Sequence, residues 1–168
     1  MTHFLIPYRF RGKTRLGDSE LALAMLKDVT DAINALGHEA LIVDGPGGQG
    51  EDVVRALATL DGAVTIVNGD VPCVTPDELD ELTKRAPAIV AARDGTTNAL
   101  AIVDPSSFAP LYGPGSAVRF EAHLDAQRLA LPGLRDDVDT WDDLERVRDR
   151  VGKHTQRYLR KLERSQAS

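Results

Sequence analysis

The stretch 62–76, Gly62-Ala-Val-Thr-Ile-Val-Asn-Gly-Asp-Val-Pro-Cys-Val-Thr-Pro76, joins an apolar run to a carboxylate and then to the start of a helix. Residues 63–67 are small or β-branched and do not alternate with polar residues, which is typical of a parallel strand buried on both faces. Asp70 then lies at the carboxyl end of that strand, where open α/β sheets bind their ligands. Pro72 cannot continue the strand because it lacks an N–H. Thr75-Pro76-Asp77-Glu78 predicts a helix start with a capping box.

Asp70 has two interpretations. Its side chain accepts local backbone N–H groups in a turn, or it is a hard oxygen ligand for Mg²⁺ close to the phosphates of a nucleotide. A second acidic cluster, Asp136-Asp137-Val138-Asp139, favours the metal. We interpret the residues before this cluster as a short apolar strand and those after it as a helix. The carboxylates are then expected to meet at neighbouring strand ends and to form a metal site.

The rest of the chain alternates predicted strands with predicted helices. Further strands are expected at 4–7, 40–43, 88–92 and 99–103. Helices are expected to begin at Asp18-Ser19, at about 51, at about 117 and after Thr140. This order predicts a three-layer α/β sandwich with a mainly parallel central sheet. A length of 168 residues suits one core, so we expect a single domain over 1–168, with a basic helical tail from about 153.

Charge and cysteine content narrow the classes of function. The net charge of −6 argues against a general binder of nucleic acid or membrane surfaces, because such proteins attract phosphates through a basic excess. No apolar run approaches the roughly 20 residues that span a bilayer. The sole cysteine, Cys73, cannot form an internal disulfide, and no leader is recognisable, so we expect a cytoplasmic protein. Cys73 is interpreted as a buried thiol and not as a nucleophile.

Two loops are candidate sites for an anion. Gly12-Lys-Thr-Arg-Leu16 follows the first strand and concentrates cations, which indicates either a phosphate loop or a solvated surface. Ser116 is the predicted N-cap of a helix whose first N–H groups can bind a phosphate or carboxylate. We interpret the hydroxyl-rich stretch Gly95-Thr-Thr-Asn98 as a turn between two strands. Arg119 and His123 are four residues apart and are expected on one face of the helix.

Five segments, taken in order, resemble one protein family. They are Gly12-Lys-Thr-Arg-Leu16, Asn68-Gly-Asp-Val-Pro72, Gly95-Thr-Thr-Asn-Ala-Leu100, Tyr112-Gly-Pro-Gly-Ser116 followed by His123, and Asp137-Val-Asp-Thr-Trp-Asp-Asp-Leu144. Together they resemble the guanylyltransferases that activate 2-phospho-L-lactate or phosphoenolpyruvate with GTP in coenzyme F-420 biosynthesis. The resemblance runs from the first strand to Leu144. It implies the nucleotide-diphospho-sugar transferase-like fold, which is Rossmann-like.

This resemblance assigns roles to individual residues. It implies that Asp70 and Asp137 bind Mg²⁺, with Asp139 as the alternative second ligand, and that Lys13 and Arg15 contact the phosphates of GTP. The residues it implies for the acid substrate are Thr97, Asn98, Gly113, Gly115, Ser116 and His123. In the implied reaction a phosphate oxygen of the acid attacks the α-phosphorus of GTP and pyrophosphate leaves, which a metal and cations promote by offsetting negative charge. No general base is required, because the phosphate is already ionised near neutral pH.

The implied ligands are GTP and a small phospho-acid, and the resemblance leaves open a homodimer and a hand-over of product to the next transferase of the pathway. The chain departs from the family in being short, in the aromatic and arginine residues of its first loop, and in lacking one glycine before Thr97. These departures concern the way in which the guanine base of GTP and the acid substrate are bound. The loop Gly48-Gln49-Gly50 is a candidate for contacting the guanine.

Three other functions compete with this interpretation. A molybdenum-cofactor guanylyl- or cytidylyltransferase would have the same fold, but its glycine-rich first loop is missing here. A phosphorelay receiver domain is also small and acidic at its strand ends, but the lysine expected at the end of a late strand is absent. A catalytically silent binding module would keep the fold, and the intact Asp70 and Asp137 argue against it.

Overall fold

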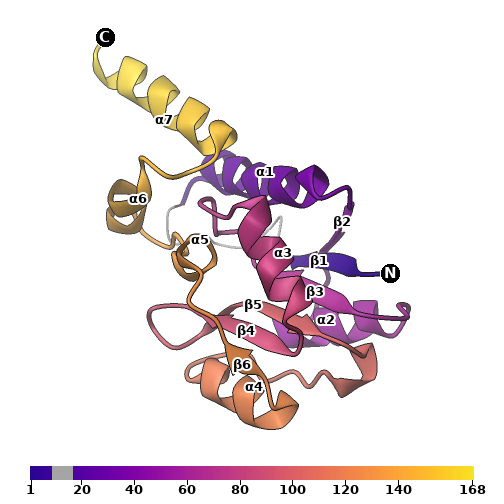
Figure 1. Ribbon diagram of the computed structural model, residues 1–168. Coiled ribbons are helices and arrows are strands. Elements are labelled where there is room, and N and C mark those ends of the chain that lie inside the picture. The colour runs from indigo at the N-terminus through magenta and orange to yellow at the C-terminus, as the bar shows by residue number, and fades with distance from the viewer. Residues whose placement is uncertain (9–16) are drawn as a thin grey trace.

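A computed structural model describes residues 1–8 and 17–168 and contains a six-stranded sheet between layers of helices (Figure 1). The strands are β1 His3–Pro7, β2 Ala40–Val43, β3 Val64–Val67, β4 Ala88–Ala91, β5 Thr97–Ile102 and β6 Gln127–Arg128, in the spatial order β2-β1-β3-β5-β4-β6. All strands except β5 run in the same direction. The reversal of β5 follows from its short connection to β4, because a tight turn can only join antiparallel neighbours. The predicted mainly parallel sheet is confirmed.

Strand β3 lies inside this sheet, as its apolar sequence predicts. All four of its residues are buried, and it pairs in parallel with β1 and antiparallel with β5. Strand β5 begins at Thr97, so the interpretation of Thr97 and Asn98 as turn residues is wrong. Both side chains are 3% exposed. Strand pairing extends over them because each polar side chain has a hydrogen-bond partner inside the protein, which removes the usual penalty for burying it.

Seven α-helices and one short 3-10 helix are present in the described residues. They are α1 Ser19–Ala35, α2 Gln49–Leu57, α3 Pro76–Lys84, η1 Pro105–Ser107, α4 Ser116–Leu124, α5 Pro132–Arg135, α6 Trp141–Val147 and α7 Lys153–Gln166. Helices α1, α3 and α5 pack on one face of the sheet, and α2 and α4 pack on the other. None of the described helices combines the length and the apolar character needed to cross a membrane.

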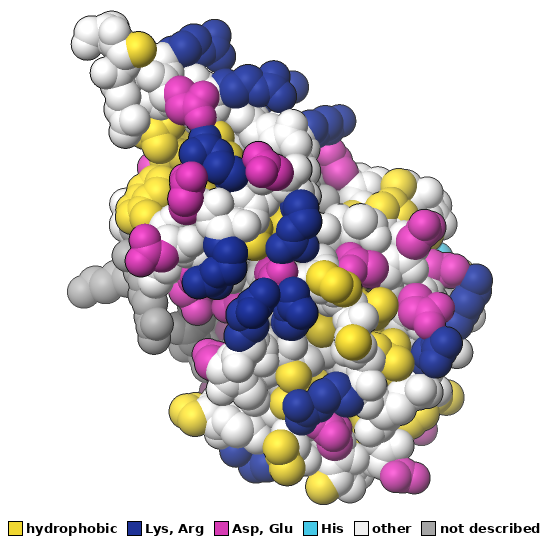
Figure 2. Space-filling view, turned by 60° about the vertical axis from the view of Figure 1, so that its left-hand side comes forward, with side chains coloured by type: hydrophobic (Ala, Val, Ile, Leu, Met, Phe, Trp, Pro, Cys, Tyr) yellow, Lys and Arg dark blue, Asp and Glu magenta, His cyan; other side chains and the backbone are white. Residues whose placement is uncertain are grey.

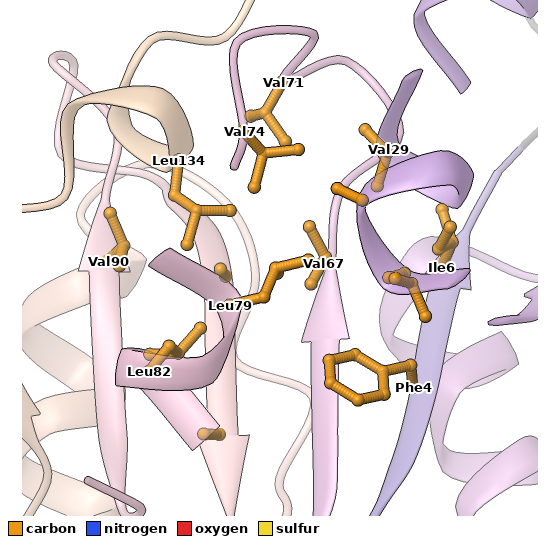
Figure 3. Close-up of a cluster of buried hydrophobic side chains, with 14 of the residues drawn as sticks. Phe4, Ile6, Val29, Val67, Val71, Val74, Leu79, Leu82, Val90 and Leu134 are labelled. Atoms are coloured by element: carbon orange, nitrogen blue, oxygen red, sulfur yellow. The ribbon is translucent and has the colours of Figure 1, made fainter. Parts of the chain in front are cut away.

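The apolar core on the α1 and α3 face lies over the strands that lead to Asp70. Figure 3 shows Leu79 and Leu82 of α3 and Val29 of α1 in one cluster with the strand residues Phe4 and Val67. All five side chains are at most 2% exposed. Burying a side chain of this size contributes about 1.5–3 kcal/mol, so this layer holds the strand ends firmly. The three-layer sandwich expected from the sequence is therefore confirmed.

The predicted helix start after β3 is confirmed in detail. The Glu78 N–H donates to Thr75 Oγ1 at 3.2 Å, and the Thr75 N–H donates to Glu78 Oε2 at 3.1 Å. Pro76 occupies the first helical position, where its missing N–H is not needed. The same reciprocal capping joins Thr140 and Asp143 at the start of α6. Each cap fixes the direction in which the chain leaves an acidic loop.

The basic tail forms a separate helix, α7, which packs against α1 and then extends beyond the rest of the molecule (Figure 1). Asp28 of α1 accepts the N–H groups of His154 at 2.9 Å and Thr155 at 3.1 Å, which satisfies the first turn of α7. A Cβ at Gly152 would lie 2.4 Å from the Asp28 carboxyl carbon. The tail is thus partly a packed element, while its basic residues Arg157, Arg160 and Lys161 are exposed.

Candidate active site

Three carboxylates meet at the carboxyl end of β3. Asp70, Asp137 and Asp139 each offer one oxygen, and these oxygens all lie within 4.8 Å of one another. Asp70 follows β3, whereas Asp137 and Asp139 lie between α5 and α6. The Val138 N–H donates to the Asp70 carbonyl oxygen at 2.9 Å, so a backbone bond holds the two segments together. The three predicted ligand candidates are therefore brought together.

The second acidic segment reaches Asp70 by a different route from the one expected. The residues before it form the short helix α5, so the predicted apolar strand at this point is wrong. Pro132 occupies the first turn of α5, where its fixed φ suits a helix and its missing N–H would weaken a strand. A Cβ at Gly133 would lie 2.5 Å from the Cys73 carbonyl oxygen, and the Gly133 N–H donates to Glu78 Oε1 at 2.8 Å. Close packing of α5 thus positions the cluster.

The surroundings of the Asp70 carboxyl group do little to balance a negative charge on it. The residue is partly exposed, yet its Oδ1 is shielded from solvent and has no hydrogen-bond partner among the described residues. Burial, together with the charges of Asp137 and Asp139, raises the pKa of Asp70 to about 8. Burial also raises the pKa of Asp137 to about 6, against a hydrogen bond from Asn98 and with help from the charge of Asp139. A divalent cation would pair the orphan oxygen and offset the repulsion, so these oxygens fit such an ion.

Two asparagines organise the surroundings of the cluster. Asn98 Nδ2 donates to the Arg135 carbonyl oxygen at 2.9 Å and to Asp137 Oδ1 at 3.1 Å, which orients Asp137. Asn68 Nδ2 donates to the Thr97 carbonyl oxygen at 3.0 Å, and its Oδ1 accepts a bond from Gln49 Nε2 at 2.9 Å. Asn68 was not among the predicted site residues. Its place directly before Gly-Asp at a strand end was the available signal.

Asp136 belongs to the acidic cluster expected at the metal, but it is not one of the three grouped carboxylates, and sequence reasoning gave it no role of its own. It is 3% exposed and is bound by Arg93, Arg135 and Arg150. Burial favours the neutral form of this carboxyl, but hydrogen bonds from the arginines outweigh that effect and hold its pKa well below the usual range. No local pattern indicates this pairing, because two of the three arginines are far from Asp136 in sequence.

The predicted acid-binding hydroxyls form a buried pair. Thr97 Oγ1 lies 2.8 Å from Ser116 Oγ, and the two residues are 3% and 0% exposed. The prediction that Ser116 is the N-cap of α4 is wrong, because Gly115 is the N-cap and Ser116 is the first helical residue. Gly115 has φ 72° and Gly113 has φ 122°, left-handed conformations that glycine adopts easily, so the chain turns before Ser116. The Ser116 side chain is then directed toward β5.

The turn before β5 is tied directly to α4. The Ala117 N–H donates to the Gly95 carbonyl oxygen at 3.1 Å, which joins the hydroxyl-rich segment to the first turn of the helix. Arg119 donates to the carbonyl oxygens of Leu111 at 2.9 Å and Pro114 at 2.7 Å, and so stabilises the glycine turn. The segments that contain Thr97, Gly113, Gly115 and Ser116 therefore form one local unit.

The remaining predicted site residues lie elsewhere. His123 is exposed, about two helical turns beyond Ser116, and its Nε2 lies 2.9 Å from the Ser107 carbonyl oxygen. It is not brought together with Thr97 and Ser116. Lys13 and Arg15 lie outside the described residues. Cys73 is buried, and burial raises the pKa of its thiol to about 11, in agreement with its interpretation as an unreactive thiol.

Comparison with curated proteins identifies the family. The chain is 32% identical over 199 residues to phosphoenolpyruvate guanylyltransferase of Nocardia farcinica, a match that covers 90% of this chain and 87% of that protein. The chain belongs to the phosphoenolpyruvate guanylyltransferase family. The protein of the same name from Conexibacter woesei is 32% identical over 155 residues, with 78% of this chain and 70% of that protein covered. No protein-family model matches the sequence. The family predicted from the five segments is confirmed.

Solved structures support the fold of this guanylyltransferase family member. A protein of Desulfovibrio desulfuricans G20 described as a nucleotide-diphospho-sugar transferase superposes with a TM-score of 0.69 at 19% identity, covering 98% of this chain and 97% of that chain. A Mycobacterium tuberculosis H37Rv protein solved as a complex with manganese has a TM-score of 0.53 at 19% identity, covering 89% and 98% of the two chains. At these identities the likeness shows the fold, which is the one predicted.

Proposed function

We propose that this chain, acting as one nucleotidyltransferase domain, transfers the guanylyl group of GTP to the phosphate of phosphoenolpyruvate. The observation that carries the proposal is the cluster of Asp70, Asp137 and Asp139 in a chain whose relatives are named phosphoenolpyruvate guanylyltransferases. The triphosphate and the leaving pyrophosphate carry a large negative charge in such a transfer. A cluster of carboxylates can hold the metal ion that offsets this charge.

The proposed metal is Mg²⁺, held by the three carboxylates. The orphan Oδ1 of Asp70 and the mutual repulsion within the cluster support an ion that prefers hard oxygen ligands. The M. tuberculosis protein was solved as a complex with manganese, and Mn²⁺, like Mg²⁺, generally prefers carboxylate oxygens as ligands. When bound, Mg²⁺ supplies positive charge to the triphosphate and to the leaving pyrophosphate. Asn98 keeps Asp137 directed toward this site.

In the proposed reaction, a phosphate oxygen of phosphoenolpyruvate forms a bond to the α-phosphorus of GTP. The bond from that phosphorus to the β-phosphate oxygen breaks, and its electron pair leaves with pyrophosphate. No proton has to be moved, because the attacking phosphate is ionised near neutral pH. The chain's task is to hold both phosphates in line, which alone accounts for much of the rate of such reactions. We assign Lys13 and Arg15 to the phosphates of GTP from their place in the first loop.

The proposed acid site is the unit built from the start of β5 and the turn before α4. No lysine or arginine occurs between residues 94 and 116, so an anion there would rest on backbone N–H groups and hydroxyls. Gly113 and Gly115 supply the backbone turn, and the buried pair of Thr97 and Ser116 lies under it. His123 is left out of this site because its imidazole is engaged with Ser107.

The direct test is release of pyrophosphate by the purified protein. We expect release with GTP, Mg²⁺ and phosphoenolpyruvate together, and none when any one of them is omitted. The same assay with ATP, CTP and UTP tests the choice of base, and 2-phospho-L-lactate tests the choice of acid. Faster release with CTP than with GTP, or release that does not depend on any phospho-acid, would contradict the proposal.

A second test concerns the acid site. Thr97→Val and Ser116→Ala are each expected to raise the KM for phosphoenolpyruvate about ten- to a hundredfold and to leave the KM for GTP nearly unchanged. Each single variant also leaves one buried hydroxyl without its partner. The double variant removes both hydroxyls and should therefore be more stable than the sum of the single changes implies. Folded variants that weaken GTP and leave phosphoenolpyruvate unaffected would show that the two sites are exchanged.

A further inference from the structure

Asp136 is bound more heavily than any other acidic side chain in the described part of the chain, although the proposed reaction does not use it. Arg93 Nε lies 3.0 Å and Arg135 Nε 2.8 Å from its Oδ1, and Arg150 Nη2 lies 2.5 Å from its Oδ2. The Asp136 side chain is 3% exposed, whereas the three arginines are 54%, 40% and 46% exposed. Lys and Arg side chains are grouped on the face that carries α5 and α6 (Figure 2).

The three arginines come from separate parts of the chain. Arg93 follows β4, Arg135 is the last residue of α5, and Arg150 lies in the turn between α6 and α7. Arg93 and Asp136 are 43 residues apart in sequence, and Arg150 is 14 residues beyond Asp136. One carboxylate therefore ties together the end of a strand and both sides of the acidic segment. The residue that follows it, Asp137, is a metal-ligand candidate.

Buried residues and metal-ligand candidates alternate along the segment 136–139. Asp136 and Val138 are buried, whereas Asp137 and Asp139 are partly exposed. Val138 packs in an apolar cluster with Leu144 and Val147 of α6, and its N–H is bonded to the Asp70 carbonyl oxygen. Because Asp136 and Val138 are both held in place on either side of Asp137, their contacts limit the directions that the Asp137 side chain can take.

We propose that Asp136 is a positioning residue, which by binding three arginines fixes the segment 136–139 so that Asp137 and Asp139 face Asp70. The inference rests on the proposed metal-dependent function, since it concerns the same three carboxylates. Residues that contact the metal ligands without binding the metal orient those ligands, and they influence metal affinity as well as activity. Loss of the Asp136 charge would leave three guanidinium groups without their shared partner and release the segment at its Asp136 end, so that Val138 alone would hold it.

The test measures Mn²⁺ binding to the purified protein without nucleotide, by titration calorimetry or electron paramagnetic resonance. Asp136→Asn keeps the volume of the side chain and removes its charge. We expect it to weaken Mn²⁺ binding about 10- to 100-fold. In turnover, the KM for Mg²⁺ should rise in parallel while the rate at saturating Mg²⁺ largely recovers. The matched control is Asp52→Asn, because Asp52 is 3% exposed and is paired with one arginine, Arg55, at 3.0 Å within α2. It should keep the parent's affinity for Mn²⁺.

The outcomes separate this inference from the proposed function. A folded Asp136→Asn variant with the parent's Mn²⁺ affinity overturns the positioning role and leaves the proposed function intact. A parent protein that binds no Mn²⁺ overturns both. An equal loss of affinity in Asp52→Asn would show a general effect of buried charge and would also overturn the positioning role. If Asp136→Asn does not fold, Arg150→Gln, which leaves two of the three arginines, should weaken Mn²⁺ binding in the same direction, and unchanged affinity in that variant overturns the inference.

Discussion

The regions around Asp136 and Asp70 deal with buried negative charge in opposite ways. Asp136 is bound by three arginines, and its pKa lies below the usual range. Asp70 has no arginine or lysine partner among the described residues, and its pKa is raised to about 8. The two lie on segments joined by the bond between Val138 and Asp70. Full pairing is found where a carboxylate holds the fold together, and missing compensation is found where an ion is proposed to bind.

The largest effect is expected from a substitution of Asp70, the uncompensated carboxylate. Asp70→Asn removes the anionic ligand, and we expect turnover to fall about a thousandfold, which corresponds to the several kcal/mol that a catalytic metal supplies. Thermal stability without metal should rise, because a neutral amide avoids the cost of burying an ionisable carboxyl group beside Asp137 and Asp139. Asp142→Asn, an exposed change on α6, is the control and should alter neither quantity. Parent-like turnover of Asp70→Asn at limiting Mg²⁺ would contradict the metal assignment.

The packing that brings the two regions together is tested at Gly133. In Gly133→Ala the new Cβ would lie 2.1 Å from Glu78 Oε2 and 2.5 Å from the Cys73 carbonyl oxygen. Because one of these atoms is backbone, relief requires movement of α5, and we expect a loss of about 1–3 kcal/mol in the free energy of unfolding measured with urea. Gly48→Ala is the control, since none of the described residues has an atom within 4 Å of a Cβ there. Equal stabilities of the two variants would show that close packing of α5 is unimportant.

The contrast between Asp70 and Asp136 also predicts how the stability of the protein depends on pH. The raised pKa of Asp70 means that the folded protein retains a proton that the unfolded chain releases, so stability without metal should fall as pH rises from about 4 to about 8. The lowered pKa of Asp136 acts in the opposite sense and only in acid, because above about pH 5 this carboxyl is ionised in both states. Free energies of unfolding at several pH values should show the decline in the parent, a flatter profile in Asp70→Asn, and a flatter profile with Mg²⁺. A parental stability that rises with pH without metal would contradict this account.

The smallest effect is expected at an ordinary surface ion pair. Arg148 contacts Glu145 and Glu163, whose side chains are 69% and 60% exposed, so water screens both pairs. Arg148→Ala should change the free energy of unfolding by about 0–1 kcal/mol. Measured beside Asp136→Asn in the same urea titrations, it separates an exposed arginine pair from the buried one. A larger loss in Arg148→Ala than in Asp136→Asn would remove the contrast between the two kinds of pairing.

Much of the fold follows from local sequence. The strands at 4–7, 40–43, 63–67 and 88–92 were predicted to within a residue or two, because runs of apolar residues bounded by turn residues carry that information. The sequence also predicts the cap at Thr75, since a capping box involves residues three apart. One prediction failed because polar side chains have distant partners. Thr97 and Asn98 were assigned to a turn, although Ser116 and Asp137 accommodate them within β5.

The residues of the candidate site also fall into those that the sequence predicts and those that depend on distant partners. The sequence singled out Asp70, Asp137 and Asp139, because carboxylates that follow an apolar strand or recur at alternate positions are visible in the order of residues. The roles of Asn98 and Ser116 were only partly predicted, since each is set by a partner from another element. His123 has the expected place on α4 but lies apart from the other acid-site candidates.

By itself the sequence determined the strand that ends near Asp70, the capped helix after it, the acidic segment and the family, all of which depend on neighbouring residues and their spacing. Only the tertiary structure decided that α5 precedes the acidic segment and that Asp136 is bound by three arginines. The physical reason is distance along the chain: the hydrogen bond from Arg93 to Asp136 joins residues 43 apart, and no local propensity reports such a contact. The charge of Asp70 was visible from the sequence, but its lack of compensation follows from what the folded chain places around it.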